Sequence, residues 1–154
     1  MNTIVLATDG SPSSAKAAAT AIELAQATGA PLHVVTAWSI PASAFGYGGL
    51  TAFPELGDAE RERAETAADA AVEQAEAAGL SVRREVGEGN AVDVICAAAE
   101  RHDAGLIVIG AHGWGALARL VFGSVSTGVL HRATHPVLVV RGAQADAAKA
   151  ESTA

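Results

Sequence analysis

The sequence predicts an α/β domain built on one five-stranded parallel sheet, doubly wound, with helices on both faces. Two observations support this fold. Short apolar runs rich in Val, Ile and Leu alternate with segments of helical period, in the order βαβαβαβαβ. The runs are almost continuously apolar, which is typical of strands buried on both faces of a parallel sheet. Right-handed crossovers and the strand order 3-2-1-4-5 then place a ligand-binding crevice between the first and fourth strands.

Composition limits the class of protein. The 154 residues carry ten basic and seventeen acidic side chains, a formal net charge of −7, and half of them are hydrophobic. One domain with its own core is expected over residues 1–142, followed by a disordered tail at 143–154. An acidic balance without a basic run argues against nucleic acid and membrane surfaces as partners. Neither a signal peptide nor a bilayer span is recognisable, so a cytoplasmic protein is expected.

The first half of the chain contains two expected strands and one helix. Ile4–Ala7 is the first strand, and Leu32–Ala37 is the second. Between them, Ser11 followed by Pro12 predicts a helix start, with a capping hydroxyl and a proline at the first helical position. The helix should end at Thr28, and its expected buried face consists of Ala15, Ala18, Ala19, Ile22 and Ala25.

The stretch from Trp38 to Gly57 has no period and is rich in glycine, proline and aromatic residues. We expect a long mobile loop over 38–57, because connections of this length in compact domains are usually functional or mobile. Its aromatic side chains either cover a ligand or pin the loop to the core or to a second subunit; they are Trp38, Phe45, Tyr47 and Phe53.

Two further helix and strand segments follow this loop. A long helix is expected from Asp58 to Ala78, with alanines at helical spacing on one face. Ser81–Val86 predicts the third strand, and its alternation of charged and apolar residues indicates an edge position. Residues 87–90, GEGN, are expected to turn the chain, and Asn90 to cap the next helix, which should end near residues 102–105.

The last stretch, Leu106 to Arg141, carries the clearest functional signal. An apolar run, Leu106–Ile109, precedes a glycine-rich segment, and Ser124 then opens a predicted helix over Val125–Ala133. Glycines let backbone N–H groups approach an anion, and a helix N-terminus adds unpaired donors with a partial positive charge. The pattern predicts a phosphate-binding loop before a final strand, Val137–Val140, although any single glycine here is more typical of an ordinary connection.

Three phosphate-loop motifs can be compared with this stretch. The Gly-Lys pair of a Walker A loop occurs nowhere in the chain, which argues against a P-loop hydrolase. The dinucleotide pattern G-x-G-x-x-G/A is matched by residues 113–118, but it follows the fourth strand instead of the first. The third motif is Gly110-x-x-Gly113, nine further residues and Gly123-Ser124, and it fits without exception.

This third motif, GAHG-WGALARLVF-GS, resembles that of the ATP-binding universal stress proteins. The segments IVLATDGSPSS, LHVVTAW, VGEGNAVDVI and SVSTGVLHRATHPVLVVR are also similar to the family pattern, so the resemblance covers nearly the whole chain. It implies a Rossmann-like fold, ATP as the ligand and a homodimer formed through the last strand, Pro136–Val140. It also implies a stress-response regulatory module with a protein partner that the sequence does not identify.

The resemblance further implies which positions meet the nucleotide. The glycine loop and the start of the following helix would hold phosphate and ribose; these positions are Gly110, Ala111, His112, Gly113, Trp114, Gly115, Ala116, Gly123, Ser124, Val125 and Ser126. Ala7, Thr8 and Asp9 would lie beside them, and the backbone at Ala37 would meet adenine. Ala111-His112 departs from the small polar residue and arginine that are common at these two positions, which affects affinity and nucleotide selectivity.

Several side chains keep two interpretations. Asp9 either caps the turn after the first strand or binds Mg²⁺ that accompanies a triphosphate. His112 either contacts phosphate or faces solvent. His131 and His135 stand four residues apart, but the sequence places no third ligand near them, so a metal pair is not expected there.

Three functions follow from these observations. In the first, ATP occupancy orders the glycine loop and the 38–57 loop and so changes a surface that partners recognise. In the second, the protein is a slow ATPase or phosphorylates itself on Ser124 or Ser126. The third is a nucleotide-free scaffold, which would not need the intact glycine motif.

Overall fold

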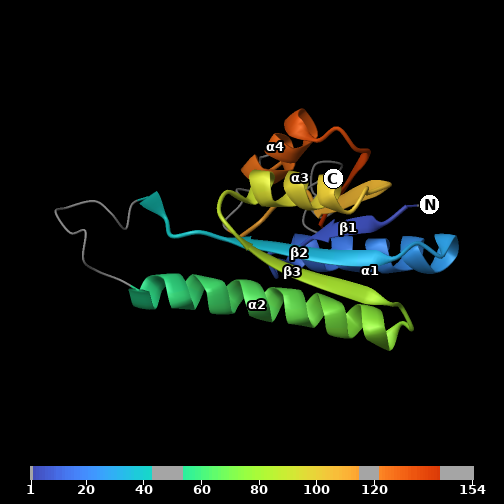
Figure 1. The fold of residues 1–154 in the computed structure, drawn as a ribbon, viewed down its shortest axis with the longest axis horizontal. Helices are drawn as coiled ribbons and strands as arrows, with labels where there is room; N and C mark the ends of the chain where they lie inside the picture. Colours follow the sequence, from blue (N-terminus) through green and yellow to red (C-terminus); the bar gives the residue numbers. More distant parts are fainter. Residues whose placement is uncertain (1, 43–53, 115–121, 143–154) are drawn as a thin grey trace, which may run out of the picture.

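The computed structural model describes residues 2–42, 54–114 and 122–142 (Figure 1). Strands and helices alternate along the chain: β1 (Ile4–Ala7), α1 (Pro12–Thr28), β2 (Leu32–Trp38), α2 (Pro54–Ala77), β3 (Val82–Glu88), α3 (Ala91–Arg101), β4 (Leu106–Gly110), α4 (Ser124–Arg132) and β5 (Val137–Val140). All four strand pairings are parallel, and the order is β3-β2-β1-β4-β5. The predicted fold class and strand order are therefore confirmed, including the edge position of β3.

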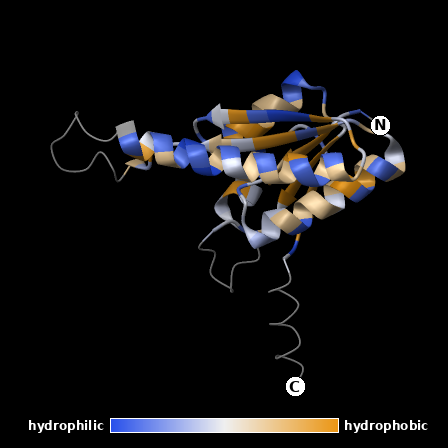
Figure 2. Ribbon diagram, turned by 90° about the horizontal axis from the view of Figure 1, so that it is seen from below, coloured by the Kyte–Doolittle hydropathy of each residue, from blue (hydrophilic) through white to orange (hydrophobic). Residues whose placement is uncertain are grey.

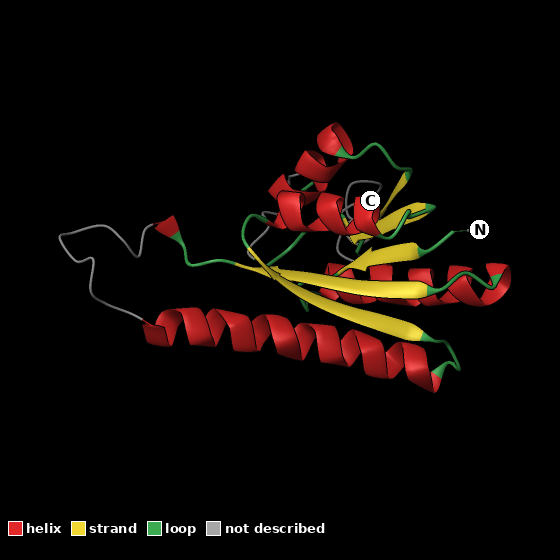
Figure 3. Ribbon diagram, in the orientation of Figure 1, coloured by secondary structure: helices red, strands yellow, loops and turns green. Residues whose placement is uncertain are grey.

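Helices cover both faces of the sheet, α1 and α2 on one side and α3 and α4 on the other (Figures 1 and 3). Leu6, Val34 and Val108 pack toward α1 and α2, and their strand neighbours Val5 and Val35 pack toward α3 and α4. Because alternate residues of the central strands β1 and β4 are buried on opposite sides, these strands are apolar throughout, whereas the edge strand β3 carries charged residues (Figure 2). This double burial explains the continuous apolar runs in the sequence.

The predicted caps of α1 and α3 are confirmed. Ser11 Oγ accepts a hydrogen bond from Ser14 N at 3.3 Å, and Asn90 Oδ1 accepts one from Val92 N at 2.9 Å. The buried face of α1 differs from the prediction, because Ala15 is exposed. The stripe consists of Ser13, Ser14, Ala17, Ala18, Ala21, Ile22 and Ala25. This buried face begins with two serines. The prediction considered apolar residues alone, so it placed the buried face of the helix at the wrong angle around the helix axis.

The helix α2 begins at Pro54, four residues before the predicted start at Asp58. Gly57 is therefore helical and buried, where the sequence suggested loop. A Cβ at Gly57 would stand 3.3 Å from Ile40 and 3.8 Å from the Trp38 ring, so glycine here permits close packing of the segment after β2. Trp38 thus packs on α2, in agreement with the pinning role. The other aromatic residues of this stretch, Phe45, Tyr47 and Phe53, lie outside the described residues, as does the 143–154 tail.

The strand β3 runs two residues beyond its predicted end at Val86, so that Gly87 and Glu88 pair with Ala37 and Trp38. The sequence suggested a turn at Gly87. A Cβ at this position would lie 2.5 Å from Val94 Cγ1. Glycine at position 87 therefore allows α3 to pack closely on β3. Close packing, like a turn, is a common reason for a glycine in the sequence of a strand.

The cysteine and the hydrophobic helices have ordinary structural roles. Cys96 is a free, buried thiol on α3, and burial raises its pKa. Within the described ranges, no helix combines the length and apolar character needed to cross a bilayer.

Candidate functional site

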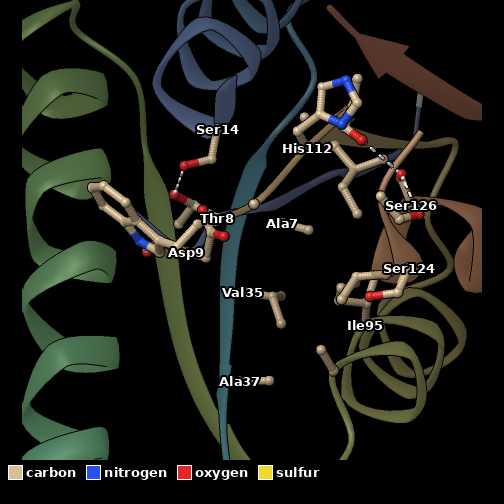
Figure 4. A pocket seen from close by; sticks show the side chains of 18 residues that line it. Ala7, Thr8, Asp9, Ser14, Val35, Ala37, Ile95, His112, Ser124 and Ser126 are labelled. Carbon is tan, nitrogen blue, oxygen red and sulfur yellow. Dashed lines mark hydrogen bonds between the residues drawn. The ribbon is translucent and has the colours of Figure 1, made fainter. Parts of the chain in front are cut away.

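A cavity of about 530 Å³ opens at the carboxyl ends of β1 and β4, where the winding of the sheet reverses (Figure 4). Its volume lies within the range of small-molecule sites. Its lining residues are Ala7, Thr8, Asp9, Ser14, Val35, Ala37, Ala91, Ile95, Ile109, Gly110, Ala111, His112, Gly113, Trp114, Gly123, Ser124, Val125 and Ser126. All the predicted site residues that the structure describes therefore lie around one cavity. Gly115 and Ala116 lie outside the described residues.

One end of the cavity is apolar. Val35 and Ala37 point into it from β2, and Ile95 and Ser124 lie on the opposite side (Figure 4). Ala37 carries only a methyl group, which leaves room for a flat ring between the sheet and α3. Sequence analysis missed five of the lining residues: Ser14, Val35, Ala91, Ile95 and Ile109. Apart from Ser14, these are ordinary apolar residues of strands and helices, and nothing in the local pattern separates them from the core.

The loop after β1 supplies the polar end. The hydroxyl of Thr8 donates to Ser14 Oγ at 3.1 Å, and Asp9 Oδ1 accepts from Ser11 N at 2.9 Å. The turn-capping interpretation of Asp9 is therefore correct for one of its two oxygens. The other oxygen faces the glycine loop, because a Cβ at Gly113 would stand 2.7 Å from Asp9 Oδ2. One carboxylate oxygen thus remains directed at the predicted phosphate position.

The glycine loop is held against the start of α1. A Cβ at Gly110 would lie 2.8 Å from both the carbonyl carbon and Oγ of Ser13, so the two backbones approach as closely as glycine allows. His112 N donates to Ser13 Oγ at 3.3 Å, and Ser11 Oγ donates to the His112 carbonyl at 3.4 Å. The burial of Ser13 in α1 and of its N-cap Ser11 is therefore explained by their contacts with this loop, whereas Ser14 contacts Thr8 and Ser11.

Two side chains of the loop take different positions. Trp114 is 71% exposed, and its Nε1 donates to the Asp9 carbonyl at 2.9 Å, which connects the glycine loop to the loop after β1. The His112 ring lies away from Val35 and Ala37 in Figure 4. Its Nδ1 is buried and has no hydrogen-bond partner among the described residues. Neither side chain therefore occupies the apolar end of the cavity.

The helix α4 begins beside this loop without a side-chain cap. Its N-cap is Gly123, not the predicted opening residue Ser124, and Gly123 has no side chain to satisfy the first N–H groups. The hydroxyl of Ser126 lies 3.0 Å from the Ala111 carbonyl and 3.1 Å from the Gly123 carbonyl, and it donates to them. Ser126 thus holds the loop to the helix, and the exposed start of α4 at Ser124 is available to an anion.

The charge around the cavity comes mainly from one carboxylate. Among the described lining residues there is no Lys or Arg, and Asp9 is the only acidic one. Donors for an anion come instead from the backbone of the glycine loop and from the start of α4. Such a site suits an uncharged ring at one end and a small anionic group at the other, and a highly charged anion would need an accompanying cation.

The universal stress protein family model matches residues 1–141. A universal stress protein encoded in the QAH/OAS sulfhydrylase 3′ region of Thermus aquaticus is 40% identical over 145 residues, covering 90% of this chain and 98% of the relative. The chain belongs to the universal stress protein family.

Two solved structures of this family carry nucleotides. A universal stress protein in complex with cAMP has a TM-score of 0.69 and 28% identity, with 92% of this chain and 98% of that chain covered. The universal stress protein from Archaeoglobus fulgidus in complex with dAMP has a TM-score of 0.62 and 26% identity, with coverages of 91% and 97%.

Proposed function

We propose that this chain binds an adenine nucleotide, ATP in the cell, in the cavity between β1 and β4. The observation that carries the proposal is the pairing of an apolar slot at Val35 and Ala37 with an uncapped helix start at Ser124, both in one cavity. The slot suits the base, and the loop and helix N–H groups suit phosphate. Two relatives solved with cAMP and dAMP support the choice of adenine nucleotides.

Isothermal titration of nucleotide-stripped protein tests this proposal. AMP, and ATP with Mg²⁺, should each bind saturably at one site per chain, and GMP should bind more weakly because its ring carries different polar groups. Absence of binding to AMP and ATP up to about 1 mM would refute the nucleotide role and favour a nucleotide-free scaffold.

Mg²⁺ is proposed to accompany ATP through Asp9. The Oδ2 of Asp9 faces Gly113, and carboxylate oxygens are the ligands that Mg²⁺ prefers. The change Asp9→Asn keeps an acceptor for Ser11 N, so the turn should persist. We expect it to weaken binding of ATP in Mg²⁺ about tenfold, and to leave AMP affinity in EDTA equal or slightly higher because a like charge is removed. Parallel titrations measure both; equal losses for the two nucleotides would contradict a role in Mg²⁺ binding.

The edge strand β5 is proposed to form a homodimer, and nucleotide binding is proposed to act through a protein partner of that dimer in the cytoplasm. The carbonyls of Pro136 and Val140 accept hydrogen bonds from Ile107 N on β4 and from Ala111 N just after it. Alternation along a parallel strand then directs the N–H of Val139 to the free edge. We therefore expect Val139→Pro, which removes only that donor, to dissociate the dimer in sedimentation experiments.

The matched control for this edge is Val139→Ala, which shortens the side chain and keeps the N–H. It should remain dimeric at the concentrations at which Val139→Pro sediments as a monomer. A wild-type monomer, or a dimer that survives the proline, would exclude pairing through this strand.

A further inference from the structure

A second cluster of ligating side chains lies away from the cavity, toward the amino ends of the strands. His33 on β2, Glu85 on β3 and His102 at the C-terminal cap of α3 each contribute one ligand atom, and these atoms lie within 4.8 Å of one another. His33 and Ala37 are four residues apart on β2, which is roughly 13 Å at the rise of a strand. The cluster is therefore separate from the nucleotide cavity.

The distances in the cluster are close to those of a metal site. His33 Nε2 lies 3.1 Å from Glu85 Oε2, and His102 Nε2 lies 3.6 Å from the same oxygen. Ligand atoms held about 2.1 Å from a tetrahedral ion stand about 3.4 Å apart, so the two distances fall on either side of this value. The two imidazole rings are stacked at 4.0 Å with an angle of 30° between their planes. A turn of the partly exposed His102 ring would bring its Nε2 toward the same point.

His33 is held ready for ligation by its surroundings. Its side chain is 4% exposed, and its Nδ1 has no hydrogen-bond partner within the described part of the chain. Burial and the nearby His102 lower the pKa of His33, although Glu85 opposes the effect. The cluster also lies at the C-terminal end of α3, where the helix carbonyls favour a cation.

Glu85 is oriented by a neighbour. One of its oxygens, Oε1, pairs with Arg101, and this leaves Oε2 for the two imidazoles. Ligating carboxylates are commonly positioned by such an additional hydrogen bond. The side chains of Glu85 and His102 are 24% and 23% exposed, so solvent can reach the side of the cluster opposite the buried His33.

We propose that His33, Glu85 and His102 bind one Zn²⁺ ion, with a water molecule in the fourth position. Two imidazoles and one carboxylate form a ligand set that suits Zn²⁺. The ion joins β2, β3 and the end of α3, in addition to the parallel pairing of β2 with β3 and the pairs made by Glu85. Zn²⁺ binding therefore stabilises the native chain by mass action and is independent of nucleotide.

The experiment uses the full chain without an affinity tag, treated with EDTA and free of nucleotide. Wild type should bind one Zn²⁺ by calorimetry, show the visible bands of four-coordinate Co²⁺, and gain thermal stability with added Zn²⁺. His102→Ala should bind Zn²⁺ at least about 30-fold more weakly, because loss of even a positioning hydrogen bond at such sites costs 10- to 100-fold. It should also lose the thermal stabilisation.

The matched control is His131→Ala, which removes an exposed histidine of α4 and should retain wild-type Zn²⁺ affinity. Long-range ¹H–¹⁵N spectra add a direct assignment, since Zn²⁺ should shift the Nε2 resonances of His33 and His102. The proposal is overturned by no saturable Zn²⁺ binding up to about 100 μM, or by equal binding to wild type and His102→Ala. Neither outcome affects the nucleotide proposal, because AMP binding in EDTA tests it without any added metal ion.

Discussion

Gly113→Val is expected to weaken binding of AMP and ATP about 100-fold while the chain remains folded. The added Cβ would stand 2.7 Å from Asp9 Oδ2, and its methyl groups would enter the space between the glycine loop and the loop after β1. Packing excess atoms into a fitted site typically costs about 1–3 kcal/mol, and every 1.4 kcal/mol is a factor of ten in affinity. Gly113 itself is exposed, and the atom in its way ends a flexible side chain, so the fold should tolerate the change. Calorimetry gives the affinity.

The control for this variant is Gly142→Val, the same change at a glycine outside the cavity. A Cβ there would lie at an ordinary 3.7 Å from Ser13, so nucleotide affinity should stay within about threefold of wild type. If Gly113→Val bound AMP as tightly as Gly142→Val does, the phosphate would have to lie elsewhere.

Gly110→Ala is expected to destabilise the fold by about 3 kcal/mol, a larger effect than its single methyl group suggests. The new Cβ would meet the Ser13 carbonyl carbon at 2.8 Å and the carbonyl oxygen at 2.9 Å. These are backbone atoms within α1, so the clash is relieved only if the helix moves off β4. Urea unfolding should show a lower midpoint at unchanged slope.

Gly142→Ala provides the comparison, because its Cβ would approach the same Ser13 at 3.7 Å without overlap. It should change the free energy of unfolding by less than about 0.5 kcal/mol. A loss below about 1 kcal/mol in Gly110→Ala would show that α1 and β4 are not packed as closely as the structure places them.

The sequence predicted the sheet well because double burial leaves a strong local signature. Four strands were recognisable as apolar runs and the edge strand β3 by its alternation of charged and apolar residues, and the alternation of strands with helices indicated a parallel sheet. The errors concern glycine, proline and serine, whose roles depend on distant neighbours. Gly57 suggested a loop and Gly87 a turn. Both lie within regular elements, where Ile40 and Val94 pack so closely that a side chain would not fit without movement. The buried Ser14 was left out of the predicted face of α1, because its partner Thr8 lies outside the helix.

The candidate site was predictable in part for the same reason. The glycine motif and Asp9 have local patterns, and the strand order brings them together around one cavity. Ile95 and Val35 have no such pattern, since they are core residues until the cavity is seen. The His33, Glu85 and His102 cluster was also missed, because its members come from three elements with no characteristic spacing. The pair with regular spacing, His131 and His135, is not part of it.

A ¹H–¹⁵N correlation titration of nucleotide-stripped protein with AMP tests the central claim, that the cavity between β1 and β4 holds the nucleotide. The account predicts saturable shifts of the amides of Gly113, Gly123 and Ser124 at the phosphate end and of Ala37 at the base end, with the amides of α2 unchanged. Binding without shifts at these four amides, or shifts concentrated on α2 and β3, would contradict it.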